Sequence, residues 1–146
     1  MAEHSLAEQM EKVIRNYFRA CKDADGKGVA ACFCPDAVHY FPGRARWVGA
    51  EAIGSGIVRL IQEQGGYWTV DQILTDVGRH AAAVEWSRFY RQRDRMSRGF
   101  EFYSFDPATV RIREIRGYYA AALSPDVARY ELADFDYAGR GYPTIP

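Results

Sequence analysis

Glu101 is the residue of this sequence with the strongest chemical signal, because it lies in the aromatic segment Gly99–Phe105. Such a segment excludes water in a folded domain, and burial disfavours an ionised carboxylate, raising its pKa by about 3 to 5 units when no cation compensates. A buried Glu101 would then donate a proton near neutral pH. The alternative is a structural ion pair, for which Arg88, Arg113 and Arg116 are the candidate partners.

Two further side chains could move a proton or bind a developing negative charge. His39 lies in a predicted strand, where an imidazole with a pKa near its reference value could accept or donate a proton. Tyr17 falls on the apolar face of the first predicted helix, where its hydroxyl could donate a hydrogen bond. A structural role remains open for both residues, since a buried tyrosine or histidine commonly needs only one hydrogen-bond partner.

The predicted strand that carries Glu101 has two partly apolar faces. Period-two alternation places Glu101 on one face and its neighbours Phe100 and Phe102 on the other. The following residues complete the face of Glu101: Ser97, Gly99, Tyr103 and Phe105. Such a strand suits a sheet that is covered by helices on one side and by a second subunit on the other.

Three helices followed by a long antiparallel meander would position these residues. Helical spacing predicts helices from Leu6 to about Ala24, over Lys27–Phe33 and from Ala50 to about Glu63, with a short strand at Ala37–Phe41. Beyond Gly66 the period changes to two, and strands are predicted at Tyr67–Val70, Ile73–Val77, His80–Arg91, Ser97–Phe105 and Thr109–Leu123. This order predicts an α+β fold in which the helices pack on one face of a curved sheet.

The composition argues against several classes of protein. The chain has 146 residues, 48% of them hydrophobic, and is expected to form one domain that buries roughly two thirds of its unfolded surface. Its 19 basic and 19 acidic side chains cancel, and neither a run of 18 apolar residues nor a secretory h-region is recognised, so we expect a soluble cytoplasmic protein without a membrane partner. The arginines between residues 91 and 98 surround a predicted hairpin tip, which indicates a solvated turn and no nucleic-acid site.

The three cysteines and the C-terminal tail give further expectations. Cys21, Cys32 and Cys34 lack the spacing of metal ligands, so we expect reduced thiols and no metal. In the tail, Ser124 and Pro125 form a good start for one helical turn. The tyrosines, glycines and prolines that follow predict an extended segment that covers its own sheet, a pocket mouth or a partner subunit.

Several short phrases follow one another with regular spacing over roughly residues 8 to 123. They are Ile14–Phe18 with Asp25 at the helix end, Phe33 with Asp36–Val38, Pro42–Gly43, Gly49 with Ile53, and Phe105–Asp106 followed by Tyr118. Their order resembles the nuclear transport factor 2-like superfamily, especially its SnoaL-like and ketosteroid-isomerase-like branch. The resemblance implies one domain over residues 1–146, with a cone-shaped core at about 8–123 and a tail at 124–146. It also implies a pocket between sheet and helices, and a homodimer through the other sheet face.

The resemblance also implies roles for site residues. Tyr17 falls where ketosteroid isomerases place the tyrosine of the oxyanion hole, and Glu101 falls where they place the protonated acid beside it. Phe41 stands where their general-base aspartate would be, so His39 is the expected substitute base. The substrate-binding wall is expected to comprise Phe41, Trp86, Tyr103, Ile115 and Tyr119. Gly54 and Gly56, which cost helix stability, suggest room for a ligand beside the third helix.

These observations predict a cofactor-independent acid/base enzyme that acts on a carbonyl-bearing ring compound as an isomerase, dehydratase or cyclase. Its expected ligand is a hydrophobic or cyclic small molecule. One alternative is a non-catalytic ligand-binding or assembly domain. A second is a hydrolase or hydratase in which an ionised Glu101, paired with Arg88 or Arg113, acts as a base.

Overall fold

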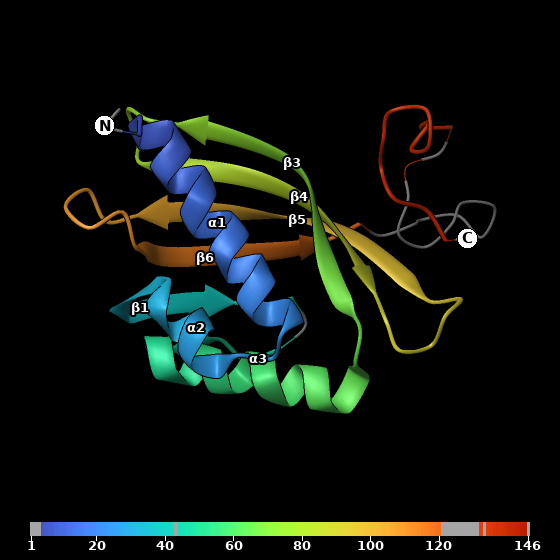
Figure 1. The fold of residues 1–146 in the computed structure, drawn as a ribbon, viewed down its shortest axis with the longest axis horizontal. Coiled ribbons are helices and arrows are strands. Elements are labelled where there is room, and N and C mark those ends of the chain that lie inside the picture. The colour runs from blue at the N-terminus through green and yellow to red at the C-terminus, as the bar shows by residue number, and fades with distance from the viewer. Residues whose placement is uncertain (1–3, 43, 121–131, 133, 146) are drawn as a thin grey trace.

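The computed structural model describes residues 4–42, 44–120, 132 and 134–145, and it contains three helices and six strands within these ranges (Figure 1). The helices are α1 (Leu6–Lys22), α2 (Gly26–Ala31) and α3 (Ala50–Gln64). The strands are β1 (Phe33–Tyr40), β2 (Trp47–Val48), β3 (Tyr67–Asp76), β4 (Ala81–Phe89), β5 (Met96–Phe105) and β6 (Ile112–Tyr119).

The helix α1 is fixed at its start by a capping box. The Ser5 hydroxyl accepts a hydrogen bond from the backbone N–H of Glu8, and the Glu8 carboxylate accepts one from the backbone N–H of Ser5. Its buried residues recur at helical spacing and include Met10, Ile14, Tyr17 and Cys21. The helix therefore presents one apolar stripe, which also carries the Tyr17 hydroxyl, to the sheet.

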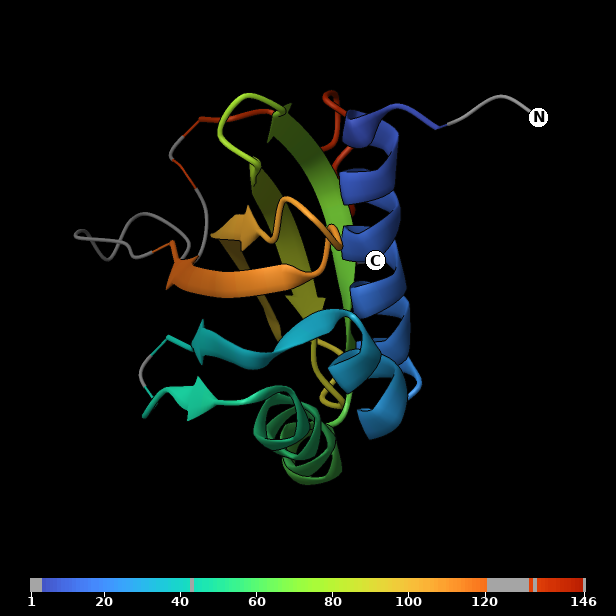
Figure 2. The ribbon, with the colours of Figure 1, turned by 90° about the vertical axis from the view of Figure 1, so that its left-hand side faces the viewer.

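The six strands form one sheet in the order β2-β1-β6-β5-β4-β3. Only the pairing of β1 with β6 is parallel among these neighbours, and the others are antiparallel. The sheet curves, with α1 lying along its inner face and α3 near β1 and β2 (Figure 2). The predicted α+β architecture, with helices on one face of a curved sheet, is confirmed, and the sheet is mainly antiparallel.

The sequence pattern missed some local features of this sheet. The strand β1 begins at Phe33, four residues before the predicted strand, and the preceding helix ends earlier, at Ala31. The two strands predicted between Tyr67 and Val77 form one strand, β3, with an irregularity between Val70 and Gln72. The strand β2 was not predicted, and Gly43, expected in a turn, lies outside the described residues.

The expectation that Gly54 and Gly56 leave room for a ligand is wrong. A Cβ atom on Gly54 would lie 2.3 Å from the backbone oxygen of Gly26 in α2. A Cβ atom on Gly56 would lie 2.4 Å from the indole of Trp47. Both glycines thus allow close packing of α3 against its neighbours, and the space beside the helix is already filled.

The described part of the tail, residues 134–145, lies against the sheet face that points away from the helices, here called the outer face. The buried Arg98 guanidinium donates a hydrogen bond to the Pro143 carbonyl oxygen at 2.9 Å and lies 4.1 Å from the centre of the Tyr137 ring. The Tyr142 hydroxyl donates to the Glu85 carboxylate. The tail therefore covers its own sheet, as one of the predicted alternatives has it, and it also borders a pocket on that face. The turn predicted at Ser124 and Pro125 lies outside the described residues.

In the described part of the chain, no helix is long and apolar enough to cross a membrane.

Candidate functional site

The inner face of the sheet brings Glu101, His39 and Tyr17 together from three elements. The Tyr17 hydroxyl of α1 lies 3.1 Å from Nε2 of His39 on β1. The same Nε2 atom lies 3.9 Å from Oε1 of Glu101 on β5. The strand β6 stands between β1 and β5, and its Gly117 is paired with Glu101, so no side chain of β6 separates the imidazole from the carboxyl at that point.

Glu101 is 6% exposed and has one close hydrogen-bond donor among the described residues. The Tyr103 hydroxyl donates to its Oε2 at 2.5 Å. Burial raises the pKa of the Glu101 carboxyl to about 7, and the hydrogen bond from Tyr103 acts in the opposite direction because it stabilises the charged form. The carboxyl can therefore lose and regain a proton near neutral pH.

His39 is fully buried, and this changes the role that its position suggested. Burial lowers the pKa of its imidazole to about 3, against a weaker opposing effect of the Tyr40 backbone. The expectation of a pKa near the reference value is thus wrong, and the ring is neutral at pH 7. Burial also raises the pKa of the Tyr17 hydroxyl well above its usual value, so Tyr17 stays protonated and can only donate or share its hydrogen.

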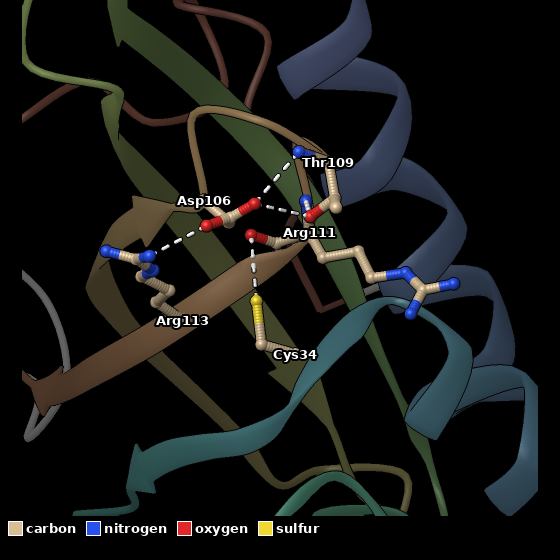
Figure 3. A network of polar contacts seen from close by, with 5 residues as sticks. All are labelled: Cys34, Asp106, Thr109, Arg111 and Arg113. Carbon is tan, nitrogen blue, oxygen red and sulfur yellow. Dashed lines mark hydrogen bonds and ion pairs between the residues drawn. The ribbon is translucent and has the colours of Figure 1, made fainter.

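The arginines proposed as structural partners of Glu101 are engaged elsewhere. Arg113 pairs with Asp106 at 2.7 Å, and Arg116 pairs with Glu114 at 2.9 Å. The Asp106 carboxylate also accepts hydrogen bonds from the backbone and side chain of Thr109 at the turn before β6 (Figure 3). The Arg88 guanidinium stacks on aromatic rings. Within the described residues, Glu101 therefore keeps a neutral environment.

A small hollow adjoins the carboxyl of Glu101. Its volume is about 10 Å³, which is room for about one water molecule. The hollow is lined by Tyr17, Phe18, Cys21, Phe41, Ile57, Trp68 and Glu101. A ring compound would need side chains of this lining to move before it could reach the carboxyl.

The five residues expected to line the substrate wall separate into three groups. Phe41 lines the hollow. Trp86 and Tyr119 share the inner face and pack edge to face at 5.3 Å. Both also border a larger pocket of about 420 Å³, which the outer face forms with the tail. Tyr103 and Ile115 are buried in the core and line neither space, although Tyr103 contributes the hydrogen bond to Glu101.

Several residues of the site were not identified from the sequence. Cys21 and Trp68 line the hollow, and Trp47 packs on the rings of His39 and Phe41 at 5.6 and 5.2 Å. For Cys21 a signal existed, because it follows Tyr17 by one helical turn and so shares its face. Trp47 gave no such signal, since it lies in a strand of only two residues.

The described residues contain no group of three or more side chains that could hold a metal ion. All three cysteines are free thiols. Cys34 borders a polar surface pocket, where its thiol donates a weak hydrogen bond to the Arg111 carbonyl oxygen at 3.8 Å (Figure 3). Burial raises the pKa of this thiol, which makes it less reactive.

A sequence profile of the SnoaL-like domain matches residues 14–115. The crystal structure of a protein of unknown function with a cystatin-like fold, from Methylobium petroleophilum PM1, shares 43% identity over 98% of this chain and 95% of that chain, with a TM-score of 0.75. No curated protein sequence matches significantly.

Two candidate polyketide cyclases share the fold. The structure from Xanthomonas campestris pv. campestris has 12% identity and a TM-score of 0.65, and the match covers 79% of this chain and 93% of that chain. The structure from Sinorhizobium meliloti has 20% identity and a TM-score of 0.64, and the match covers 75% of this chain and 98% of that chain. At such identities the likeness shows a shared arrangement of helices and strands and does not identify a reaction.

Proposed function

This chain belongs to the SnoaL-like domain family, and we propose that it is a cofactor-independent acid/base enzyme acting on a carbonyl-bearing ring compound. The observation that carries this proposal is the buried carboxyl of Glu101, whose pKa of about 7 suits proton transfer near neutral pH. Glu101 and Tyr17 line the same hollow, so a substrate atom that enters it could contact both side chains.

Enolisation is the proposed core step. The ionised Glu101 removes a proton from the carbon beside the substrate carbonyl, so the electron pair of the broken C–H bond forms a C=C bond and the π pair of the carbonyl moves to its oxygen. The protonated Glu101 then returns the proton to another carbon of the conjugated system, which completes an isomerisation. Cyclisation or dehydration would begin with the same proton removal.

Tyr17 is the proposed donor to the developing enolate oxygen. When His39 carries its hydrogen on Nε2, it donates to the Tyr17 hydroxyl, 3.1 Å away, and leaves the Tyr17 hydrogen free to point into the hollow. His39, expected from the sequence to be the base, becomes a positioning residue in this proposal because its pKa of about 3 makes it a weak base. Loss of one such oxyanion donor typically costs about 10² to 10³ in rate.

Deuterium exchange provides a test that needs no knowledge of the natural substrate. Cyclohexanone and 2-tetralone would be incubated with the protein in D₂O, and loss of the signals beside the carbonyl would be followed by proton NMR. We expect exchange above the buffer rate for at least one ketone, and a loss of about 10² to 10⁴ in Glu101→Gln. The matched control is Glu114→Gln on β6, whose carboxylate pairs with Arg116. Exchange by none of the ketones, or equal exchange in both variants, would contradict the proposal.

A second candidate function is ligand binding without chemistry, which is favoured by the pocket of about 420 Å³ on the outer face. That pocket is far larger than the hollow, and Glu101 does not line it. Ketone-induced NMR shifts that are confined to residues of this pocket, without deuterium exchange, would favour the second function. A homodimer and a cytoplasmic location stay predictions, the first of which light scattering can check.

A further inference from the structure

Arg88 has the largest fully buried side chain in the described part of the chain and is 1% exposed. It lies on β4, paired with Trp68 of β3 and with Ser97 of β5. Alternation along β4 places it on the inner face with Val84 and Trp86, and Val84 is the register partner of Glu101. Burial of a charged guanidinium on the sheet face that carries the candidate site is costly and needs a physical explanation.

The guanidinium has aromatic neighbours and a hydrogen bond with the Tyr119 hydroxyl, but no carboxylate partner among the described residues. Its central carbon lies 4.2 Å from the centre of the Trp68 ring and 4.4 Å from that of Tyr90. Nε and Nη2 are buried without a hydrogen-bond partner. Leaving such donors unpaired away from water is costly, and more so when the group is charged. The aromatic faces compensate only in part, since a cation–π contact supplies no hydrogen-bond acceptor in the ring plane.

The two unpartnered nitrogens share one edge of the guanidinium plane. Nε–H and the hydrogen of Nη2 beside it are parallel donors, and two carboxylate oxygens accept from such a pair side by side. The rings of Trp68 and Tyr90 hold the plane and so fix the direction of this edge. The arrangement is preorganised for a planar anion.

Trp68 connects Arg88 to the candidate site. The half-buried Trp68 lines the hollow beside Glu101 and also packs against the Arg88 guanidinium. Cys21, which lines the same hollow, lies close enough for the charge of Arg88 to act on its thiol. Trp68 is therefore a shared neighbour of the hollow and of the Arg88 guanidinium.

We propose that Arg88 recognises a carboxylate of the substrate, so that the substrate class is a ring compound bearing both a carbonyl and a carboxylate group. The inference rests on the proposed function, because it assigns the carbonyl end to Glu101 and Tyr17. The carboxylate binds to Nε and Nη2 of Arg88 and neutralises the buried charge. Trp68 packs against the ring of the bound compound.

The test compares two probes of nearly the same shape, 3-oxocyclohexane-1-carboxylate and the neutral 3-oxocyclohexane-1-carboxamide. Dissociation constants would be measured by NMR titration at neutral pH. We expect the acid to bind about 10- to 100-fold more tightly than the amide to the unaltered protein, as for hydrogen bonds to a charged partner. In Arg88→Gln the two probes should bind alike. The matched control is Arg95→Gln, because the exposed Arg95 guanidinium stacks on the same Tyr90 ring at 4.1 Å.

Equal affinity for acid and amide, no binding of the acid at millimolar concentration, or a preference that survives Arg88→Gln would overturn the inference. The comparison of acid with amide needs no variant, so it decides the matter even if Arg88→Gln does not fold. Deuterium exchange recorded in the same samples separates the two proposals. Acid preference without exchange upholds the role of Arg88 and contradicts acid/base chemistry. Equal exchange of both probes upholds acid/base chemistry and contradicts the role of Arg88.

Discussion

Tyr103 and Glu101 lie two residues apart on one face of β5, and their hydrogen bond sets the proton affinity of the carboxyl. The Tyr103 hydroxyl donates to the carboxyl at 2.5 Å and favours its charged form. Burial acts in the opposite direction and is the larger influence. The pKa of about 7 is therefore a balance that a single substitution can shift.

Replacing Tyr103 by phenylalanine should raise the pKa of Glu101 above 7. The variant loses the donor but keeps the ring, which stacks on Phe105 with centres 6.2 Å apart. Since the ionised carboxyl is the proposed base, the rate of exchange should rise with pH, and the midpoint of that rise should move to higher pH in the variant. A rate profile from pH 5 to 9, with the probe ketone that the unaltered protein exchanges fastest, measures the midpoint. An unchanged midpoint, or a shift to lower pH, would show that the hydrogen bond does not act on the catalytic group.

The variants Glu101→Gln and Glu101→Ala distinguish a Glu101 that acts as a base from one that only donates a hydrogen bond. If Glu101 only donated a hydrogen bond, the role expected from the sequence resemblance, the amide of Glu101→Gln would retain much of the activity. If Glu101 transfers the proton, Gln and Ala should both lose about 10² to 10⁴ in exchange rate. The ratio of the two rates is the measurement, and a Gln variant with near-normal exchange would reject the base role.

Among the elements, the short strand β2 and the helix α3 pack against the side chains that border the site. Trp47 of β2 packs on the rings of His39 and Phe41, and it fits against α3 only because position 56 has no side chain. In Gly56→Ala, the gain in helix propensity of about 1 kcal/mol opposes an overpacking cost of about 1 to 3 kcal/mol. We expect a net loss of stability and a displaced Trp47.

Urea unfolding measures the effect of Gly56→Ala, with Ser55→Ala as the control. Ser55 is the exposed neighbour in α3, so its replacement should leave stability unchanged or slightly improved. A Gly56→Ala variant as stable as the control would mean that the indole of Trp47 moves aside without cost.

The elements also show what the sequence pattern could predict. The helices α1 and α3 and the strands β4 and β5 were expected within a few residues, because hydrophobic periodicity survives over ten residues or so. The parallel pairing of β1 with β6 joins segments about 75 residues apart, which no local pattern encodes. The glycines of α3 were misinterpreted for a related reason, since only the packed structure reveals that an indole fills the space. The meeting of Glu101, His39 and Tyr17 was anticipated by family resemblance, whereas the small size of the hollow was not.

For the whole molecule, the two buried groups of the site affect stability with opposite signs. The imidazole of His39 has a folded-state pKa of about 3 against an ordinary value of 6.5, so stability is lost as pH falls from 6.5 towards 3. The carboxyl of Glu101 has a folded-state pKa of about 7 against 4.5, so its contribution is full below pH 4.5 and is lost as pH rises to 7. Between pH 4.5 and 6.5 the two slopes oppose each other.

Glu101→Gln isolates one of these effects, because His39 titrates in both proteins and cancels in the difference. Above pH 8 the folded protein holds an ionised carboxyl in a buried site, and glutamine removes that charge while its amide oxygen can still accept from Tyr103. The variant should therefore become more stable than the unaltered protein by up to about 3 kcal/mol above pH 8, relative to their difference at pH 4.5. Urea unfolding at intervals from pH 4.5 to 8.5 measures this change, with Glu114→Gln as the control that should show little change with pH. Parallel curves for Glu101→Gln and the unaltered protein would place the Glu101 pKa near its ordinary value and remove the physical basis for proton transfer at this position.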